Sequence, residues 1–240
     1  MSHYEQKKFV KICFKYLKEE NNFEKFDVID VGSYDLNGSI KELLLNNKYT
    51  GVDLIKGPNV DYVLNGEDLH KIGKKFDVAI SCECFEHAAN WKKIFRSMYD
   101  VLNDDGILIF TCASRGRIEH GTIRSNPENP LMGNYYKNLN ESDFKKNFNL
   151  KEMFTKYFFF YNIYSFDLYF IGGKNLSKTN INLSQIKFET KKIKNLKNEL
   201  SIKRIIYSFI LPDNVFQNFR FFRRKITNAI KKKNYTNKIT

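Results

Sequence analysis

Apolar residues in the first 173 positions follow two patterns that alternate along the chain. Helical spacing of Phe9, Ile12, Tyr16 and Leu17 predicts an amphipathic helix over residues 4–20. Short apolar runs predict buried strands over 26–31, 49–54, 60–64, 76–82 and 107–112, with helices over 39–45 and 91–102 and a turn at 103–106. Strands that alternate with helices indicate a mostly parallel sheet that is covered on both faces.

Two aromatic runs follow, at residues 158–161 and 168–171, with a short polar break between them. They favour an antiparallel pair that closes the edge of the sheet. We therefore expect a Rossmann-like three-layer α/β sandwich with a mostly parallel seven-stranded sheet, an antiparallel edge strand and a basic helical C-terminal extension.

The charge of the chain is concentrated at its end. The 240 residues carry a formal charge of +13. Residues 1–173 hold 23 basic and 24 acidic side chains, whereas residues 174–240 hold 17 basic and 3 acidic ones. An AT-rich gene would raise the Lys content as well, but such a bias acts on the whole chain. The break predicts a nearly neutral domain over 1–173 and a basic, partly helical extension over 174–240.

Several classes of protein are disfavoured. The four cysteines, at positions 13, 82, 84 and 112, match no zinc spacing and are too few for a disulfide scaffold. We expect free thiols in a reducing compartment and no metal ion. The polar N-terminus leads into no secretory apolar segment, which favours a cytoplasmic protein.

The ends of the first two predicted strands carry a candidate ligand site. Gly32 permits a sharp turn after the first strand, and Tyr34 stands where a dinucleotide-binding loop has its second glycine. A bound pyrophosphate is therefore disfavoured. Asp53 ends the second strand and can accept hydrogen bonds from both hydroxyls of a ribose. The pattern indicates an adenosine-type ligand without a pyrophosphate.

The ordered set of segments resembles a known family. Residues 28–38, Asp53, residues 76–87 and residues 105–110 are together similar to the class I S-adenosylmethionine-dependent methyltransferases, over about residues 25–173. The Gly-Ser-x-Asp-x-Asn-Gly loop at 32–38 resembles a branch that modifies sugars and other small polar metabolites. The resemblance implies S-adenosyl-L-methionine as the cofactor.

The resemblance also implies roles for individual residues. The loop under the amino-acid part of the cofactor would contain Asp30, Gly32, Ser33 and Gly38, with Tyr34 as a departure from the family pattern. Asp53 would hold the ribose and Leu54 would flank the adenine. One of Glu67, Asp68 and Leu69 would meet the adenine edge, and Cys82 and Glu83 would line the floor beneath the sulfonium.

Candidate catalytic and substrate-binding residues follow the fourth and fifth strands. A hydroxyl acceptor needs a base, and Glu86, His87 and His120 are the candidates. The alternatives are a structural role for His87, as an anchor of the following loop, and a solvated loop position for His120. The long loop over 114–136 contains residues suited to an anionic or sugar substrate, namely Arg115, Arg117, Arg124, Tyr135 and Tyr136. A plain polar surface loop is the alternative.

The basic extension contains an amphipathic pattern. Asp213 is a suitable N-cap, and apolar residues recur at helical spacing from Val215 to Ile230 beside clustered Arg and Lys. Three interpretations stay open for residues 213–233: an anionic membrane surface, nucleic acid, or packing on the domain or a second subunit.

Methyl transfer to a small polar acceptor, with a sugar or glycan-precursor hydroxyl favoured, is our principal hypothesis. The alternatives are an RNA methyltransferase that grips its substrate with the basic tail, and a non-catalytic module bound to a membrane surface. The sequence leaves the acceptor and the oligomeric state open.

Overall fold

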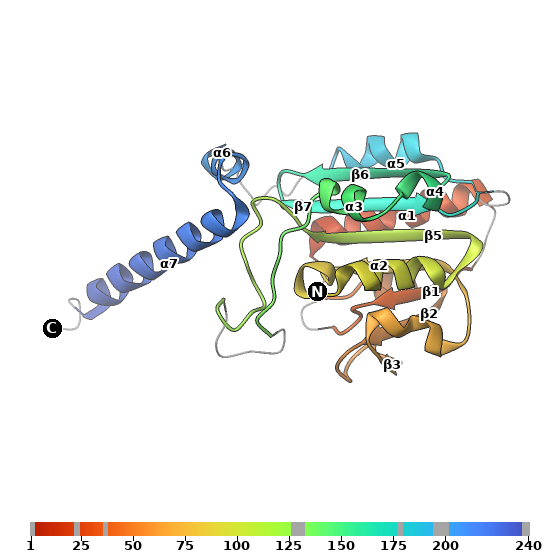
Figure 1. Ribbon diagram of the computed structural model, residues 1–240, viewed down its shortest axis with the longest axis horizontal. Coiled ribbons are helices and arrows are strands. Elements are labelled where there is room, and N and C mark those ends of the chain that lie inside the picture. Colours follow the sequence, from red (N-terminus) through yellow and green to blue (C-terminus); the bar gives the residue numbers. More distant parts are fainter. Residues whose placement is uncertain are drawn as a thin grey trace.

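A computed structural model of the chain describes residues 3–21, 25–35, 38–125, 133–176, 180–193 and 202–236. It contains a seven-stranded sheet with the strand order β3-β2-β1-β4-β5-β7-β6 (Figure 1). The strands are β1 (Asp27–Val31), β2 (Lys48–Asp53), β3 (Tyr62–Val63), β4 (Phe76–Cys82), β5 (Leu102–Ala113), β6 (Lys156–Asn162) and β7 (Asp167–Gly173).

The helices are α1 (Tyr4–Asn21), α2 (Trp91–Asp100), α3 (Glu141–Asn147), α4 (Leu150–Met153), α5 (Leu183–Thr190), α6 (Ile202–Ile210) and α7 (Asp213–Thr236). Short 3₁₀ helices are η1 (Lys41–Leu43), η2 (Gly66–Ile72) and η3 (Phe85–His87). Among the helices that the structure describes, none is both long and apolar enough to cross a membrane.

The sheet has the predicted topology. Strands β1 to β5 pair in parallel, whereas β7 runs antiparallel to both β5 and β6. The two aromatic runs therefore form the antiparallel edge, with β6 outermost. This confirms the mostly parallel seven-stranded sheet of the predicted α/β sandwich.

Alternating side chains of the central strands build a core on each face of the sheet. In β5, Leu108 and Phe110 pack toward α2, α3 and α4, whereas Ile107 and Ile109 pack toward α1 and α5. The first core is rich in aromatic rings, and Phe110 stacks on Phe144 with 4.6 Å between ring centroids. Successive side chains of a strand point to opposite sides, so the sheet has two apolar faces. Helices cover each face, which gives the three layers.

Two local expectations were wrong. The helix predicted over 39–45 is only the three-residue η1, between Gly38 and the turn at Asn47, because so short a segment cannot repay the cost of starting an α-helix. The turn predicted at 103–106 is a bulge inside β5. Phe76 of β4 pairs with Leu102, and Val78 already pairs with Ile107, so the residues between them leave the ladder.

The chain beyond residue 173 contributes to the body as well as to an appendage. Ile181, Ile186 and Ile193 are buried against α1 and the sheet. Helix α7 then extends away from the sheet (Figure 1). The division at residue 173 stays a prediction about charge, since the apolar core continues past it.

Candidate active site

A cavity of about 480 Å³ opens at the carboxyl ends of β1, β2 and β4. In the strand order, β2 lies on one side of β1 and β4 lies on the other, so the direction of the chain connections reverses at β1. Open α/β sheets bind ligands at such a reversal. Its volume lies within the range of about 300–1,000 Å³ typical of small-molecule sites. A broader surface cleft of about 790 Å³ lies between η2 and α2, but charged side chains dominate it and no strand ends there.

The loop after β1 brings bare backbone to the cavity at Gly32. Its φ of 86° is in the left-handed region, and a Cβ at this position would lie 2.8 Å from Cβ of Cys84. The amides of Gly32 and Ser33 both donate to the carbonyl oxygen of Val52, at 2.9 and 3.1 Å. The loop is therefore fixed to β2, and a side chain would not fit at its turn.

Asp53 lines the cavity with its carboxylate held in place by backbone. Oδ2 accepts from the amide of Tyr34 at 3.0 Å, and Oδ1 accepts from the amide of Ile55 at 3.3 Å. A carboxylate has about four acceptor positions, so each oxygen keeps one for a ligand. Leu54 and Ile55 stand beside it with 67% and 38% of their surface exposed, which places apolar side chains at the rim of the cavity.

The other residues predicted for the first loop lie outside the cavity. Asp30 is a buried residue of β1, and its carboxylate accepts a hydrogen bond from the Tyr49 hydroxyl at 2.8 Å. Burial raises the pKa of Asp30 to about 6. Ser33 is buried beside Gly51, and the Gly38 amide donates to Asp35 at 2.7 Å. Leu36 and Asn37 lie outside the described residues, and the predicted role of the loop stays a prediction.

The three residues predicted for the adenine edge do not line the cavity, and their role stays a prediction. Glu67 and Asp68 line the charged cleft, and Leu69 lies in the core. Asn65 and Gly66 line the cavity instead. Oδ1 of Asn65 accepts from the Glu67 amide and from Nδ2 of Asn90, both at 3.2 Å, so its orientation is fixed. Its position as the N-cap of η2 is the sequence signal that could have identified it.

The floor of the cavity is formed by Glu83 and Cys84, whereas Cys82 points into the core. Glu83 has a φ of 57°, an unfavourable left-handed conformation for a residue with a side chain, of the kind that concentrates at functional sites. Glu83 directly follows β4 and lines the cavity, while its carboxylate contacts Gln6, Arg117 and His120.

A buried ionic cluster surrounds Glu83. Its carboxylate lies 3.2 Å from Nε2 of His120 and 3.5 Å from the Arg117 guanidinium, and Gln6 of α1 also donates to it. Arg117 and His3 in turn contact Asp167, at 3.6 and 2.9 Å. Elements distant in sequence are thereby joined beneath the cavity.

The cluster fixes the charges of its members. Burial alone would raise the pKa of Glu83, but Arg117 and the bond from His120 outweigh it and hold this pKa below its usual value. Burial likewise opposes the charge of His3, but Asp167 and Glu5 raise its pKa to about 9. Glu83 is therefore an anion at the edge of the cavity at neutral pH.

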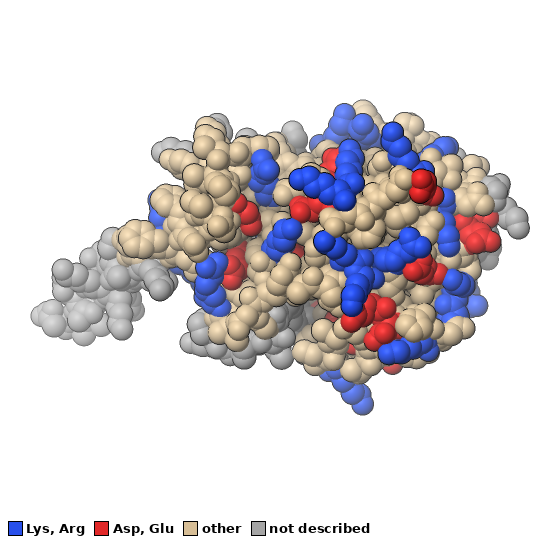
Figure 2. Space-filling model, in the orientation of Figure 1, with Lys and Arg blue, Asp and Glu red and all other residues tan. Residues whose placement is uncertain are grey.

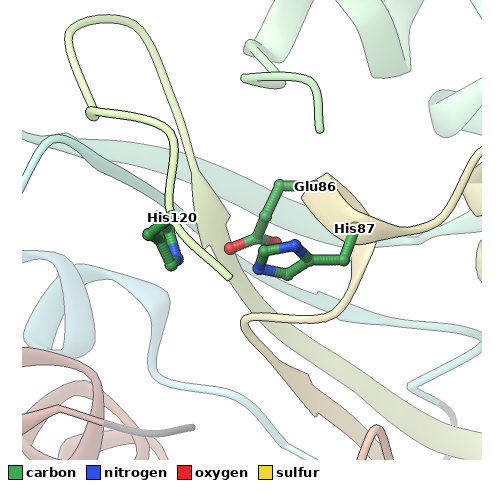
Figure 3. Close-up of side chains that lie close together, drawn as sticks. All are labelled: Glu86, His87 and His120. Carbon is green, nitrogen blue, oxygen red and sulfur yellow. The ribbon is translucent and has the colours of Figure 1, made fainter. Parts of the chain in front are cut away.

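Glu86, His87 and His120 point toward one another (Figure 3). One ligand atom from each lies within 4.8 Å of the other two. Glu86 and His87 come from η3, and His120 comes from the loop after β5. Tyr136 completes an aromatic group with the two histidines, with ring centroids 5.1–5.5 Å apart. The three candidate catalytic residues thus form one cluster, of which His87 lines the cavity.

Within this cluster, the surroundings disfavour the charged forms of both Glu86 and His87. Burial and the nearby Glu83 raise the pKa of Glu86 well above its usual value. Burial and His120 lower the pKa of His87 to about 4. Oε2 of Glu86 and Nδ1 of His87 are both buried without a hydrogen-bond partner among the described residues. Two buried polar atoms without partners are costly, which marks this cluster as functional.

Two clusters also offer ligand atoms that could hold a cation. These are Glu86, His87 and His120, and the group of His3, Glu83 and Asp167. The second is occupied by its own ion pairs with His3 and Arg117. The expectation of no metal ion stays a prediction.

The loop over 114–136, described here without residues 126–132, gives its arginines protein partners. Arg117 belongs to the buried cluster, Arg124 is paired with Glu119, and Arg115 lies over the Phe209 ring at 5.1 Å. None of these three lines the cavity among the residues described there. Tyr135 does line it, and Tyr136 packs on the two histidines. The predicted contact with substrate stays a prediction for all five residues.

Helices α6 and α7 brace this loop, a contact with the domain of the kind that one of the three interpretations of residues 213–233 expects. Gln217 accepts from the Glu119 amide at 2.9 Å and donates to the Arg117 carbonyl oxygen at 2.7 Å. Arg204 donates to the Gly116 carbonyl oxygen at 2.9 Å. The first turns of the basic extension therefore form part of the scaffold of the site.

Comparisons with known proteins agree with the fold. A sequence profile of the family described as a methyltransferase domain matches residues 3–162. The chain therefore belongs to this methyltransferase family, which confirms the resemblance to class I S-adenosylmethionine-dependent methyltransferases. No curated protein matches the chain.

Solved structures share the fold at low sequence identity. The CurJ carbon methyltransferase is 15% identical with a TM-score of 0.52, over 70% of this chain and 54% of that chain, so this chain spans about half the length of that structure. The plantazolicin methyltransferase BpumL in complex with SAH is 14% identical with a TM-score of 0.52, over 71% and 84%. An S-adenosylmethionine-dependent methyltransferase from Clostridium acetobutylicum is 16% identical with a TM-score of 0.50, over 72% and 93%.

Proposed function

We propose that this protein transfers the methyl group of S-adenosylmethionine to a hydroxyl of a small polar acceptor, such as a sugar or a glycan precursor. The observation that carries the proposal is the cavity itself. It brings the bare backbone of Gly32, the Asp53 carboxylate and the uncharged His87 ring to the carboxyl ends of adjacent strands. The family supports methyl transfer, and the finer choice of acceptor rests on the residues of the site.

The cavity fits a nucleoside with a charged sulfur. The exposed Leu54 and Ile55 offer apolar contact for a base, and Asp53 keeps free acceptor positions for the hydroxyls of a ribose. Glu83 stays ionised at the floor, where a negative charge suits a cationic centre. S-adenosylmethionine, when bound, supplies an electrophilic methyl group.

His87 is suited to receive the proton of a hydroxyl acceptor. Its ring lines the cavity and is uncharged, because burial lowers its pKa to about 4. Glu86 lies in the same cluster, and one ligand atom of its carboxyl group lies within 4.8 Å of the His87 ring. A positioned base of this kind contributes about 10²- to 10⁴-fold to a rate. The pair favours an acceptor that must lose a proton, as a sugar hydroxyl does.

A titration with S-adenosylmethionine tests the site directly. Asp53→Ala should weaken binding about tenfold to a hundredfold, because hydrogen bonds to a charged group contribute about 1.5–3 kcal/mol. Asp53→Asn keeps an acceptor for the loop amide and should have a smaller effect. The control is Asp104→Ala, in the exposed bulge of β5. Equal affinity of wild type and Asp53→Ala would remove the ribose assignment.

A labelled-methyl screen tests the acceptor class. Transfer to a carbohydrate or nucleotide-sugar fraction is expected, and transfer to RNA is not. Label that appears only in RNA would replace the proposed acceptor with the nucleic-acid alternative. Binding of S-adenosylmethionine without turnover on any fraction would favour a non-catalytic module.

A further inference from the structure

Helices α6 and α7 expose an unusual concentration of apolar side chains. Of the 17 large apolar residues that are exposed in the described chain, eight lie between Ile206 and Ile226. Ile210 is 70% exposed and Phe222 is 63% exposed. Figure 2 shows mainly uncharged side chains over α6, whereas acidic and basic side chains intermingle on the body. Such a patch on one segment marks an interaction site.

The exposed residues of α7 form a single stripe. Val215, Phe219, Phe222 and Ile226 recur at spacings of four, three and four residues, which places them on one face of a helix. Phe216 and Gln217, which lie on a different face, are buried against the active-site loop. The stripe therefore points away from the body, along a helix that itself extends outward (Figure 1).

Helix α6 adds a second exposed apolar face next to the first. Ile206, Phe209 and Ile210 are exposed, whereas Ser208 is buried. The rings of Tyr207 and Phe219 lie 6.0 Å apart, which joins the surfaces of the two helices. We call the exposed apolar residues of α6 and α7 the helical patch, namely Ile206, Tyr207, Phe209, Ile210, Val215, Phe219, Phe222 and Ile226.

Basic residues lie near the helical patch along the sequence. Residues 202–236 contain nine basic side chains and one acidic one, Asp213. Arg223 and Arg224 are both exposed beside Phe222. The acidic Asp213 is occupied by a hydrogen bond from Asn138 at 2.8 Å. Apolar residues flanked by arginine and lysine suit a partner that has an anionic surface and an apolar layer beneath that surface.

We propose that the helical patch docks on an anionic phospholipid bilayer. The apolar stripe enters the boundary between headgroups and acyl chains, and the surrounding arginines and lysines contact the anionic headgroups. Amphipathic helices with aromatic and aliphatic residues on one face and basic residues beside it bind membranes in this way. This inference does not depend on the proposed methyl transfer.

Two other occupants fit the same surface less well. A second copy of the chain would bring two strongly basic segments together, and like charges repel. RNA would match the charge, and its bases stack on aromatic rings, but isoleucine and valine offer no such stacking. The aliphatic half of the helical patch is thus accounted for by lipid.

Vesicle sedimentation with the full chain tests the proposal. The vesicles are phosphatidylcholine alone, or phosphatidylcholine and phosphatidylglycerol in equal amounts, each at low and high salt. We expect binding to the anionic vesicles that weakens as salt is raised, and little binding to phosphatidylcholine alone. Equal binding to both compositions, or no binding to either, would overturn the proposal.

Two pairs of substitutions separate the apolar and the charged contributions. Phe222→Ser with Ile226→Ser should weaken vesicle binding at least about tenfold, because two large apolar side chains are removed from the interface. Leu45→Ser with Phe188→Ser is the matched control, since both residues are exposed on the body. Arg223→Glu with Arg224→Glu should abolish the preference for anionic vesicles, whereas Lys145→Glu with Lys146→Glu on α3 should leave it unchanged.

Circular dichroism and affinity for S-adenosylmethionine should be unchanged in all four double variants, because none of these residues lines the cavity.

The two other occupants of the helical patch, RNA and a second copy of the chain, give distinct results. If the arginine pair of substitutions abolishes binding of an RNA oligonucleotide while the apolar pair leaves vesicle binding intact, the proposal is overturned in favour of RNA. A dimer in sedimentation equilibrium that the apolar pair dissociates would overturn it in favour of a second copy.

Discussion

His87 and His120 have the same side chain but different neighbours. Nε2 of His120 lies 3.2 Å from a Glu83 oxygen, and its Nδ1 lies 3.1 Å from the carbonyl oxygen of Ile118. Both ring nitrogens of His120 are thus occupied by oxygen partners within the protein. His87 has a buried nitrogen without a partner among the described residues, and its ring lines the cavity. The base of the proposed reaction is therefore His87, with His120 as an anchor for Glu83.

His87→Gln should lower kcat about 10²- to 10⁴-fold while the affinity for S-adenosylmethionine changes little, because the base acts on the acceptor. In the wild type, kcat/KM should not fall as the pH is lowered from about 8 to 6, since a histidine acts as a base only when unprotonated and this pKa is about 4. Stopped assays across this range with the acceptor found by the screen provide the measurement.

His120→Gln is the comparison for that experiment. It should alter cofactor affinity or stability through Glu83 more than it alters kcat. Full turnover by His87→Gln, or a decline of the wild-type rate near pH 6.5 that His120→Gln removes, would contradict the assignment of the base.

At the level of elements, the turn after β1 depends on a glycine for two separate reasons. Gly32 has a φ of 86°, and a Cβ would also meet Cys84. Gly73, which ends η2, has a similar φ of 75° but nothing within 4 Å of an added Cβ. The two positions therefore separate backbone strain from steric exclusion.

Gly73→Ala should cost about 1 kcal/mol of unfolding free energy, the price of a left-handed alanine. Gly32→Ala should cost about 1–3 kcal/mol more, as expected for a side chain forced into a packed site. It should also weaken S-adenosylmethionine binding, because the loop that holds Tyr34 and Asp53 must move. Urea unfolding and titration measure the two effects, and equal losses in the two variants would show that the contact with Cys84 has no cost.

The sequence was informative where the periodic pattern was long. Strand β4 has the predicted bounds, Phe76–Cys82, because an unbroken apolar run of this length is typical of a central parallel strand. Helix α3 was missed because Phe144 is its only buried apolar residue, although Asn140 and Asp143 form a capping box that would have marked its start. Short elements carry too little hydrophobic pattern to be recognised without their caps.

The same limit applies to the candidate site. Asp53 and Gly32 were identifiable because strand ends meet at one edge of a parallel sheet. The three residues predicted for the adenine edge do not line the cavity, because β3 has only two residues and gives the sequence pattern little to mark its end. The ionic cluster around Glu83 could not be predicted, since its contacts join α1, β4, β7 and the loop after β5. Such contacts depend on tertiary packing rather than on local sequence.

At the scale of the whole molecule, the basic extension has two parts with separate duties. Its inner part, up to Phe221, contacts the active-site loop, since Arg124 donates to Asn218 and lies over the Phe221 ring. Its outer part, from Phe222 onward, carries the exposed Phe222 and Ile226 and six of the nine basic residues of 202–236. The whole extension is therefore not a dispensable tail, and its removal would not distinguish an RNA substrate from a sugar.

Truncation at two points tests this division. A chain that ends at residue 201 loses the brace bonds of Arg204 and Gln217, at about 1 kcal/mol each, and should melt several degrees lower with at least about tenfold lower kcat. A chain that ends at Arg223 keeps those bonds and should retain the wild-type melting temperature and kcat. Differential scanning fluorimetry and labelled-methyl assays measure both, and similar behaviour of the two truncated chains would refute the brace.

The brace has a thermodynamic consequence. Gln217 grips the loop next to the reacting centre through two backbone groups, and the same helix carries the surface that faces outward. If a ligand in the cavity orders that loop, it also favours the position of α7 in which Gln217 holds the loop. An interaction that immobilises α7 in this position must then raise the affinity for the ligand by the same factor. Occupancy of the pocket and attachment at an interface would rise together, so that the protein would be most active where it is held.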